Sequence, residues 1–531
     1  MARVPKAKER PKRSRRKRCR KPLKTRSRVV VRKGKRRKEQ YCARPRKRRK
    51  KALSSPVAVA PAVTIPPPVV TPPPPGVSGP AIEGVPVYDG PFGRREAERL
   101  LWRAGFGPAP GQGDALAKLG VDAAVRSLTR PQAPEQFIGP APQGNNGGAL
   151  DPEGSHGHDH LWWFDRMIRT NRPLIERMTL VWHDWFATSN ATVDSVRMMF
   201  IQNEMFRRDG LGSFRQLLLN VASDGAMLKW LNGWVNKAGK PDENYSRESM
   251  ELFTLGEGRG YTETDVREMA RAHTGWAADR SPVGWVNFHI EPKLQDRGEK
   301  TIFGKRGKFD WADASNLCCD HPMHPSFVVE KLWSYFIPTP PPQSTREAME
   351  RAYVAGGMVV LPLVEAILMH PDLYRGESMV KPPVVLAAGL CRARGKGVTG
   401  DALFTWTEMA GQRLFHPPNV NGWEDEAWLD TTTMRARWMM VYHLLSASWI
   451  DMESQAGTTY DPAESPSQAV ARALAFWADP PLSDASRQTL TDWAASCLPA
   501  ARNAREASQV RALRQNALRQ LVGVAPDLQV S

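Results

Sequence analysis

The stretch Asp242-Glu-Asn-Tyr-Ser-Arg-Glu-Ser-Met-Glu-Leu-Phe-Thr-Leu-Gly256 is the segment on which the interpretation of the whole chain depends. It predicts a helix over residues 243–255 that stops at a glycine suited to the position after a helix end. Apolar or small residues cover most of that helix, so we expect it to be buried nearly all round. At about 100° per residue, four polar residues fall within one charged wedge roughly 100° wide: Asn244, Arg247, Glu248 and Glu251.

The charged wedge allows two interpretations. Arg247 and Glu251 are four residues apart, so their side chains can meet on one helix face. Asn244 and Glu248 have the same spacing. In the first interpretation, the wedge is a solvated face with ion pairs worth about a few tenths of a kcal/mol. In the second, it is a buried polar network, which can be purely structural or can form a catalytic site.

Four further blocks of the sequence share a pattern with a known family. They are Leu100-Leu-Trp-Arg-Ala-Gly-Phe-Gly-Pro108, Glu176-Arg-Met-Thr-Leu-Val-Trp-His-Asp-Trp-Phe-Ala-Thr-Ser189, Tyr261-Thr-Glu-Thr-Asp-Val-Arg-Glu-Met-Ala-Arg-Ala-His-Thr-Gly-Trp276 and Gly411-Gln-Arg-Leu-Phe-His-Pro-Pro-Asn-Val-Asn-Gly-Trp423. With the stretch above, and in the same order, they resemble a large bacterial family catalogued as domain of unknown function 1800. The resemblance covers roughly residues 94 to 531 and implies membership without implying an activity. It falls on all four wedge positions, which favours a buried polar network.

His183 is the best-placed histidine for a functional role. It borders the apolar stripe of a predicted helix over residues 173–188, within a block that matches the family pattern. A histidine at such a border often forms only local hydrogen bonds, and this alternative stays open. In the enzymatic hypothesis, His183 carries a proton and Arg247 binds an anionic group. Glu248 or Glu251 then acts as a base or a ligand.

Asn244 and three residues outside the wedge are candidates for substrate binding. Lys300 lies in a loop where Gln295 replaces a histidine that family members often carry, which weakens any role of this loop as a source of a general base. Asn419 and Trp423 belong to a rigid turn that contains two prolines. Such a turn is as consistent with closing a helix-packing layer as with forming a site.

The sequence predicts no metal site. Cys318-Cys-Asp-His-Pro-Met-His324 carries zinc-ligand side chains, but their spacing fits no usual zinc site. The loop His156-Gly-His-Asp-His160 is expected to bind metal only adventitiously. No Walker loop, dinucleotide fingerprint, nucleophile elbow or zincin motif occurs. The cofactor therefore stays unknown.

Charge divides the chain into an arm and a body. Residues 1–51 hold 28 Lys or Arg against two Glu, a net charge of +26; since the whole chain is +20, residues 52–531 sum to −6. A segment with so many basic residues and so few apolar ones is predicted to be a disordered arm. We expect this arm to bind a polyanion, either nucleic acid or an anionic cell-wall polymer. Residues 52–90 form a Pro/Ala/Val-rich linker that is expected to be extended.

Residues 91–531 predict a mainly α-helical body. Helical signals recur from residues 94–104 to residues 503–521, and the single strand-like run, 284–290, is expected to form one small hairpin with residues 300–303. The chain has 18 tryptophans. Helical spacing recurs among Trp182, Trp185, Trp230 and Trp234, which favours a core role over a sugar-stacking surface.

No segment of the sequence predicts a transmembrane helix or a secretory signal. The cytoplasm is therefore the default compartment, whereas family members often look exported, which keeps the cell envelope or secretion as the alternative. Two functional hypotheses remain open. The first is an enzyme that uses an Arg/Glu/His polar site for acid–base chemistry on an unknown substrate. The second is a non-catalytic envelope or scaffold protein anchored to a polyanion through the basic arm.

Overall fold

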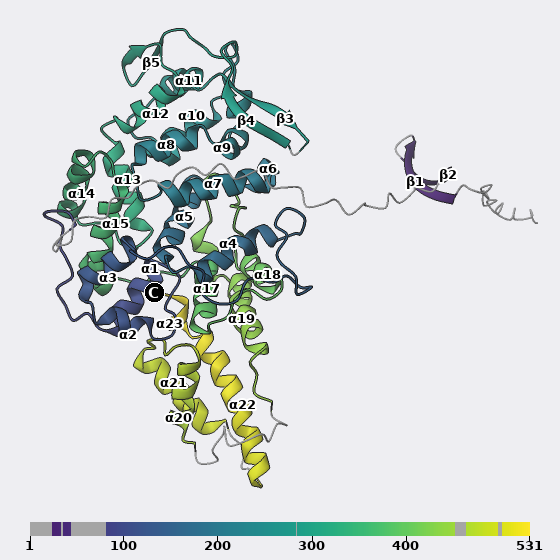
Figure 1. The fold of residues 1–531 in the computed structure, drawn as a ribbon, viewed down its shortest axis with the longest axis vertical. Helices are drawn as coiled ribbons and strands as arrows, with labels where there is room; N and C mark the ends of the chain where they lie inside the picture. Colours follow the sequence, from purple (N-terminus) through teal and green to yellow (C-terminus); the bar gives the residue numbers. More distant parts are fainter. Residues whose placement is uncertain (1–23, 33–34, 44–80, 283, 452–463, 498–501) are drawn as a thin grey trace, which may run out of the picture. The chain divides into compact units, whose positions relative to one another are not determined.

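A computed structural model gives the fold and describes residues 24–32, 35–43, 81–282, 284–451, 464–497 and 502–531 (Figure 1). The chain divides into two units, Met1–Pro67 and Pro68–Ser531. The rest of the predicted basic arm, and the predicted linker up to residue 80, lie outside the described residues.

The described part of the first unit is a pair of antiparallel strands, β1 (Lys24–Arg32) and β2 (Lys35–Ala43). Both lie within the predicted basic arm. Their 18 residues include eight Lys or Arg and one Glu, which gives this β-ribbon a net charge of +7.

The second unit is mainly α-helical, which confirms the predicted fold class. Its first helices are α1 (Arg94–Arg103), α2 (Gln112–Ala117), α3 (Gly120–Thr129), α4 (His158–Arg169), α5 (Pro173–Trp185), α6 (Asn190–Val193), α7 (Val196–Asp209), α8 (Phe214–Ala222) and α9 (Gly225–Trp230). The middle of the unit contains α10 (Asn244–Glu248), α11 (Glu263–Ala272), α12 (Trp311–Cys319), α13 (His324–Ser334), α14 (Gln343–Ala355), α15 (Val360–Met369) and α16 (Pro371–Arg375). The last helices are α17 (Pro383–Ala393), α18 (Ala402–Met409), α19 (Thr431–Ser446), α20 (Pro466–Phe476), α21 (Asp484–Ser496), α22 (Ala504–Gly523) and α23 (Pro526–Gln529).

Several helices begin at residues whose side chains favour a helix start, and the sequence alone shows these residues. Pro173 opens α5, where its missing N–H leaves no helical hydrogen bond unmade. Thr262 and Asp265 form a capping box at the start of α11, as their spacing predicts. The predicted helix over residues 243–255 exists, but it changes after α10 into a π-helical segment, Ser249–Thr254. Among the described residues, every helix is too short or too polar to span a lipid bilayer.

The predicted pairing of the strand-like run is wrong. That run is β4 (Gly284–Ile290), and it pairs with β3 (Trp276–Ser281), while β5 (Lys300–Ile302) pairs with β6 (Lys305–Gly307). Each strand pairs with its nearest neighbour along the chain, and a glycine begins β4 or lies in the β5–β6 turn. Gly284 has φ +109° and Gly304 has φ +73°, values that allow a tight reversal.

Helix α5 lies in the interior of the unit and contributes to two hydrophobic clusters (Figure 1). Trp182 and Trp185 are fully buried in the larger cluster, which confirms the core role predicted for them. Trp230 and Trp234, for which the same role is predicted, are only partly buried. Leu180, on another face of the helix, belongs to the second cluster. A helix in this position has little access to water, so its charged residues need partners within the protein.

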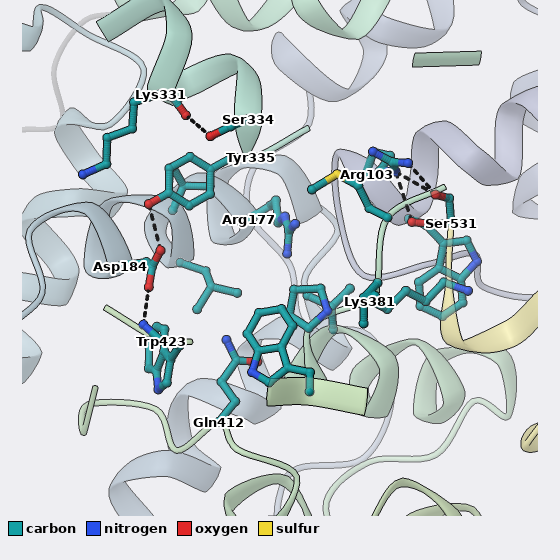
Figure 2. A pocket seen from close by; sticks show the side chains of 18 residues that line it. Arg103, Arg177, Asp184, Lys331, Ser334, Tyr335, Lys381, Gln412, Trp423 and Ser531 are labelled. Atoms are coloured by element: carbon teal, nitrogen blue, oxygen red, sulfur yellow. Dashed lines mark hydrogen bonds between the residues drawn. The ribbon is translucent and has the colours of Figure 1, made fainter. Parts of the chain in front are cut away.

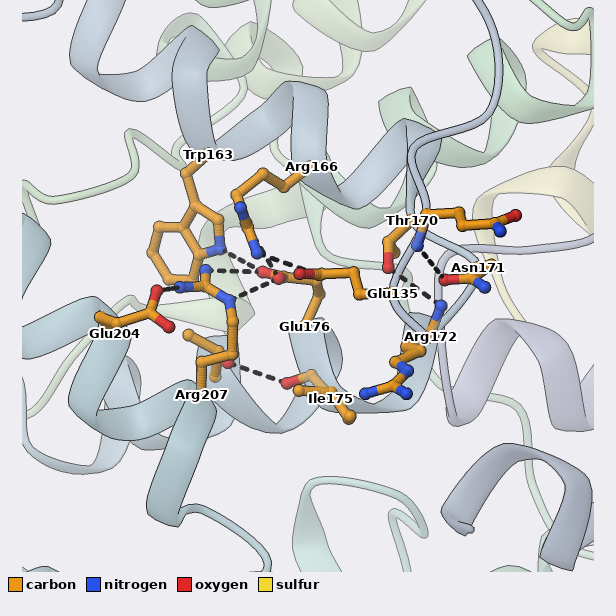
Figure 3. A network of polar contacts seen from close by, with 12 residues as sticks. Glu135, Trp163, Arg166, Thr170, Asn171, Arg172, Ile175, Glu176, Glu204 and Arg207 are labelled. Atoms are coloured by element: carbon orange, nitrogen blue, oxygen red, sulfur yellow. Dashed lines mark hydrogen bonds and ion pairs between the residues drawn. The ribbon is translucent and has the colours of Figure 1, made fainter. Parts of the chain in front are cut away.

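Glu176 in α5 is the centre of a buried polar network that joins three helices (Figure 3). Its carboxylate accepts hydrogen bonds from Trp163 Nε1 at 3.0 Å and Arg166 Nε at 3.1 Å, both in α4. Arg207 of α7 donates to both carboxylate oxygens, at 2.6 and 2.9 Å. Burial raises the pKa of Glu176, but Arg207 and Arg166 offset this and hold the pKa below its ordinary value.

We expect Glu176→Gln to destabilise the protein by about 3–5 kcal/mol, because it leaves the Arg166 and Arg207 charges without their buried counter-charge. Glu204→Gln is the matched control, since Glu204 also pairs with Arg207 but is 65% exposed. It should cost less than about 1 kcal/mol. Denaturant unfolding of both variants measures the difference, and equal losses would contradict a structural role for the Glu176 network.

Candidate functional site

A cavity of about 230 Å³ lies between α5, α13 and the segment that precedes α17 (Figure 2). Helix α5 contributes Arg177 and Asp184, which are seven residues apart and so lie on one helix face. Lys331 of α13 and Tyr335, four residues later, also line the cavity. The two helices therefore each present polar side chains to one enclosed space.

Asp184 holds two walls of the cavity together. Its Oδ2 accepts a hydrogen bond from the Tyr335 hydroxyl at 2.8 Å, and its Oδ1 accepts one from the main-chain N–H of Trp423 at 2.8 Å. Gly422 precedes Trp423 with φ +93°, and a Cβ there would collide with the Asp184 carboxylate. A glycine is therefore needed for this turn to approach α5.

Lys331 lies at the edge of the cavity in apolar surroundings. Its Nζ donates to the main-chain oxygen of Leu252 at 2.8 Å and lies 4.7 Å from the centre of the Trp185 ring. Burial lowers the pKa of Lys331 to about 8, although the Asp184 charge acts in the opposite direction. A lysine with this pKa can gain or lose a proton near neutral pH.

Arg177 is a buried cation without a fixed counter-ion. Its side chain is 6% exposed, its Nε has no hydrogen-bond partner, and no carboxylate of the described residues forms an ion pair with it. Burial lowers the pKa of Arg177 to about 10, against the effect of the Asp184 charge, so the group stays protonated at neutral pH. A buried guanidinium in this state is suited to binding an anion.

The other unpaired polar atoms of the cavity lining are also donors. The indole Nε1 atoms of Trp423 and Trp428 are buried without a hydrogen-bond partner among the described residues. Indole N–H groups donate and never accept hydrogen bonds. Both atoms have almost no accessible surface, so they belong to the packed wall of the cavity and are not exposed to its interior.

A family model described as "Protein of unknown function (DUF1800)" matches residues 99–530. The chain belongs to this family. No curated protein and no solved structure matches the chain.

Three of the five sequence blocks that carry the family pattern line this cavity. The first block supplies Arg103, the second supplies Arg177 and Asp184, and the last supplies Trp423. The wedge stretch does not line the cavity, but its Leu252 oxygen accepts a hydrogen bond from Lys331. The three lining blocks are far apart in sequence, so their convergence marks the cavity as a common point of the family pattern.

The charged wedge lies elsewhere, in a partly exposed cluster of ion pairs. Arg247 is 31% exposed and pairs with Glu263 at 2.8 Å, Glu243 at 3.2 Å and Glu251 at 3.4 Å. Burial, and then the Glu251 charge, raise the pKa of Glu248. Among the described residues, no hydrogen bond or ion pair joins this cluster to His183.

His183 is fully enclosed by aromatic rings. The ring centres of Trp163, Phe415 and Trp423 lie 5.4, 5.6 and 5.5 Å from that of His183. Its Nε2 is buried without a hydrogen-bond partner, and burial lowers its pKa to about 3. His183 is therefore neutral at physiological pH and packs behind Trp423, next to Asp184 in the sequence.

The four predicted substrate-binding residues are divided among three places. Trp423 lines the cavity, whereas Asn419 lies in the preceding turn, where its Nδ2 donates to Glu424 at 3.3 Å. Asn244, a member of the charged wedge, is the first residue of α10. Lys300 is buried, and its Nζ donates to the main-chain oxygens of Asp296 and Gly298 at 2.7 and 3.0 Å. No group of three or more His, Cys, Asp or Glu in the described residues is arranged to hold a metal.

Three residues of the cavity, Arg177, Asp184 and Lys331, are absent from the sequence-based site. The sequence does contain a feature that could have pointed to these three residues. Each is a charged residue within a predicted helix, and its neighbouring residues are largely apolar. Spacing alone does not show that α5 and α13 face each other. The sequence thus indicates the block that contains the site but selects His183 instead of its neighbour Asp184.

We expect Arg247→Ala to cost less than about 1 kcal/mol of folding free energy, because its partners Glu263 and Glu243 are 60% and 40% exposed. Urea unfolding of this variant beside the wild type measures the loss. A loss of about 3 kcal/mol or more would show that the wedge acts as a buried network.

Proposed function

We propose that the cavity binds a small molecule through an anionic group held by Arg177, and that Lys331 exchanges a proton with the bound molecule. The observation that carries this proposal is the buried Arg177 guanidinium, which lacks a fixed carboxylate partner. The Asp184 charge favours the protonated form of Arg177 but forms no ion pair with it. A buried charge without a close partner is costly, so a protein that keeps one gains something from it elsewhere. A ligand carboxylate or phosphate would supply both the counter-charge and the acceptors for Arg177.

The charge balance of the lining supports an anionic ligand. Arg103, Arg177, Lys331 and Lys381 line the cavity, and Asp184 is the one Asp or Glu side chain among the lining residues. Arg103 is already bound by oxygens of Ser531. The Asp184 carboxylate is oriented by Tyr335 and by the main chain of Trp423. Asp184 and Tyr335 therefore remain beside the ligand as a hydrogen-bonded pair, while the cations attract it. Lys331, with its pKa lowered to about 8, is the group that can transfer a proton at neutral pH.

Under this proposal, the site residues predicted from the sequence have roles that differ from those the sequence suggested. Trp423 forms part of the ligand-binding wall, and His183 supports that wall from behind. The acid–base role assigned from sequence to Arg247, Glu248 and Glu251 remains a hypothesis on which the cavity does not depend. An enzyme is therefore favoured over a scaffold by the properties of the cavity.

Arg177→Met should abolish anion binding without destabilising the unliganded protein, because it removes a buried charge that has no fixed partner. Thermal unfolding with inorganic phosphate, butyrate and glutarate measures both effects. At about 100 times Kd, a ligand stabilises the wild type by about 2.7 kcal/mol, which raises its Tm. Titration calorimetry in two buffers then reports the proton exchange, which Lys331→Met should remove.

Arg435→Met is the matched control, since Arg435 is exposed on α19. It should leave the response to each anion unchanged. The proposal fails if no anion raises the Tm, or if both arginine variants respond as the wild type does.

A second candidate function, polyanion binding, concerns the first unit alone. The β1–β2 ribbon carries a net charge of +7, within an arm of net charge +26. Each phosphate that such an arm neutralises releases counterions, so the affinity should fall steeply with salt. Partners of this chemistry include nucleic acid and anionic wall polymers.

We expect the full chain to bind duplex DNA without sequence preference, and binding to weaken sharply as salt is raised. A shortened protein that begins at Val85 should bind DNA weakly or not at all. Fluorescence titrations at two salt concentrations compare the two proteins. Equal, salt-insensitive binding by both would rule out the arm as the polyanion-binding element.

A further inference from the structure

The side of the cavity away from Asp184 carries a second buried cation, Lys381. It is 3% exposed and lies two residues before α17. Its Nζ donates to the main-chain oxygen of Leu528 at 2.8 Å and lies 4.0 Å from the centre of the Trp102 ring. An ammonium group has three donors. The charges of Glu98 and Asp527 favour the charged form of Lys381, but neither carboxylate forms an ion pair with it among the described residues. In the view of Figure 2, Arg177 lies between Asp184 and Lys381.

Arg103 lies within electrostatic reach of both cations. Burial, and then the charges of Arg99 and Arg177, lower the pKa of Arg103 to about 9. Burial likewise holds the pKa of Lys381 well below its ordinary value, and the Arg103 charge adds to this effect. Like charges repel strongly where water is excluded. A cationic row, Arg177–Arg103–Lys381, therefore lines the cavity, and a ligand with two negative charges would relieve its repulsion.

The three members of the cationic row differ in how many of their N–H donors have a hydrogen-bond acceptor within the protein. Arg103 donates to the main-chain oxygens of Phe336 and Ser531, so its guanidinium is held in place. Arg177 Nε has no partner, and Lys381 has one acceptor for its three donors. The two outer members of the row are therefore the ones that remain available to a ligand.

The cavity that the two available cations line also has apolar walls. Leu180, Val181 and Val385 line the cavity. The volume of about 230 Å³ corresponds to roughly eight water molecules, at about 30 Å³ for each. A molecule of about ten non-hydrogen atoms fits that volume, and the apolar walls favour methylene groups in its middle.

We propose that the cavity selects ligands with two anionic groups on a short apolar chain, and that Lys381 determines this selectivity. The proposal rests on the anion-binding function proposed above, in which Arg177 holds one of the groups. Lys381 binds the second group through the donors that Leu528 leaves unused. An anion beside Lys381 also favours its charged form, so the ligand itself strengthens the contact. Dicarboxylates and phosphorylated carboxylates share this chemistry.

Wild-type protein alone provides the first test, by titration calorimetry with glutarate and with its monomethyl ester. The two probes have similar shape but differ by one negative charge. We expect glutarate to bind about 10- to 100-fold more tightly, which is the range for one charge-assisted hydrogen bond. 3-Phosphonopropionate, measured in parallel, distinguishes a preference for phosphate-like groups from one for carboxylates. Equal affinities for glutarate and its ester would overturn the proposal.

Lys381→Met provides the second test, because methionine has a similar length and adapts to apolar surroundings. The variant should bind glutarate and the ester within about threefold of each other, with the affinity for the ester unchanged. Lys396→Met is the matched control, since Lys396 is exposed, and it should keep the wild-type preference. If Lys381→Met keeps the wild-type preference for glutarate over the ester, Lys381 does not determine the selectivity and the proposal is wrong.

The two proposals fail in different ways. If the ester binds in an Arg177-dependent manner and glutarate binds no better, anion binding stands and selectivity for two charges is wrong. If no probe binds, both proposals are wrong. Because the comparison of the two probes needs only wild-type protein, a failure of Lys381→Met to fold leaves the selectivity proposal fully testable.

Discussion

Burial of charge is the constraint on which the arrangement around α5 depends. This helix carries Glu176, Arg177, His183 and Asp184 within an otherwise apolar interior. Three of the four are accommodated in different ways. Glu176 has arginine and tryptophan partners, Asp184 accepts hydrogen bonds from Tyr335 and Trp423, and His183 is held neutral by burial. The elements around α5 are positioned to supply these partners. Arg177 alone lacks one, and the cavity lies in front of it.

Asp184 explains why distant segments of the chain come together at this place. Its carboxylate binds the Trp423 turn on one side and Tyr335 of the α13 end on the other. Gly422 permits the close approach of that turn, and Lys331 connects α13 to the π-helical end of the wedge stretch through Leu252. The same contacts that close the core therefore build the cavity walls. Structural and functional demands fall on the same residues, so three of the sequence blocks of the family line the cavity.

The sequence predicts what depends on local periodicity and fails where the answer depends on long-range contacts. The helical class, the capping box at Thr262 and the burial of Trp182 and Trp185 all follow from spacing. The strand partner of residues 284–290 was wrong because β pairing is decided by turn geometry, which a pattern of alternation does not contain. Periodicity also does not distinguish a polar face that meets solvent from one that meets another helix. Arg247 illustrates the first case and Arg177 the second.

A comparison among the buried arginines separates a structural cation from one that awaits a ligand. Arg392 pairs with no carboxylate in the described residues, yet it donates to the main-chain oxygens of Gly107 and Ile168, at 3.2 and 2.9 Å. Arg103 is held in the same way by Phe336 and Ser531. Carbonyl oxygens compensate these buried charges permanently, so such residues bind loops together. Arg177 has the same burial but no such acceptors, and it faces a cavity instead of a loop. The Asp184 charge acts on Arg177 only from beyond ion-pair distance. This arginine, more than the number of cations, therefore marks the cavity as the candidate site.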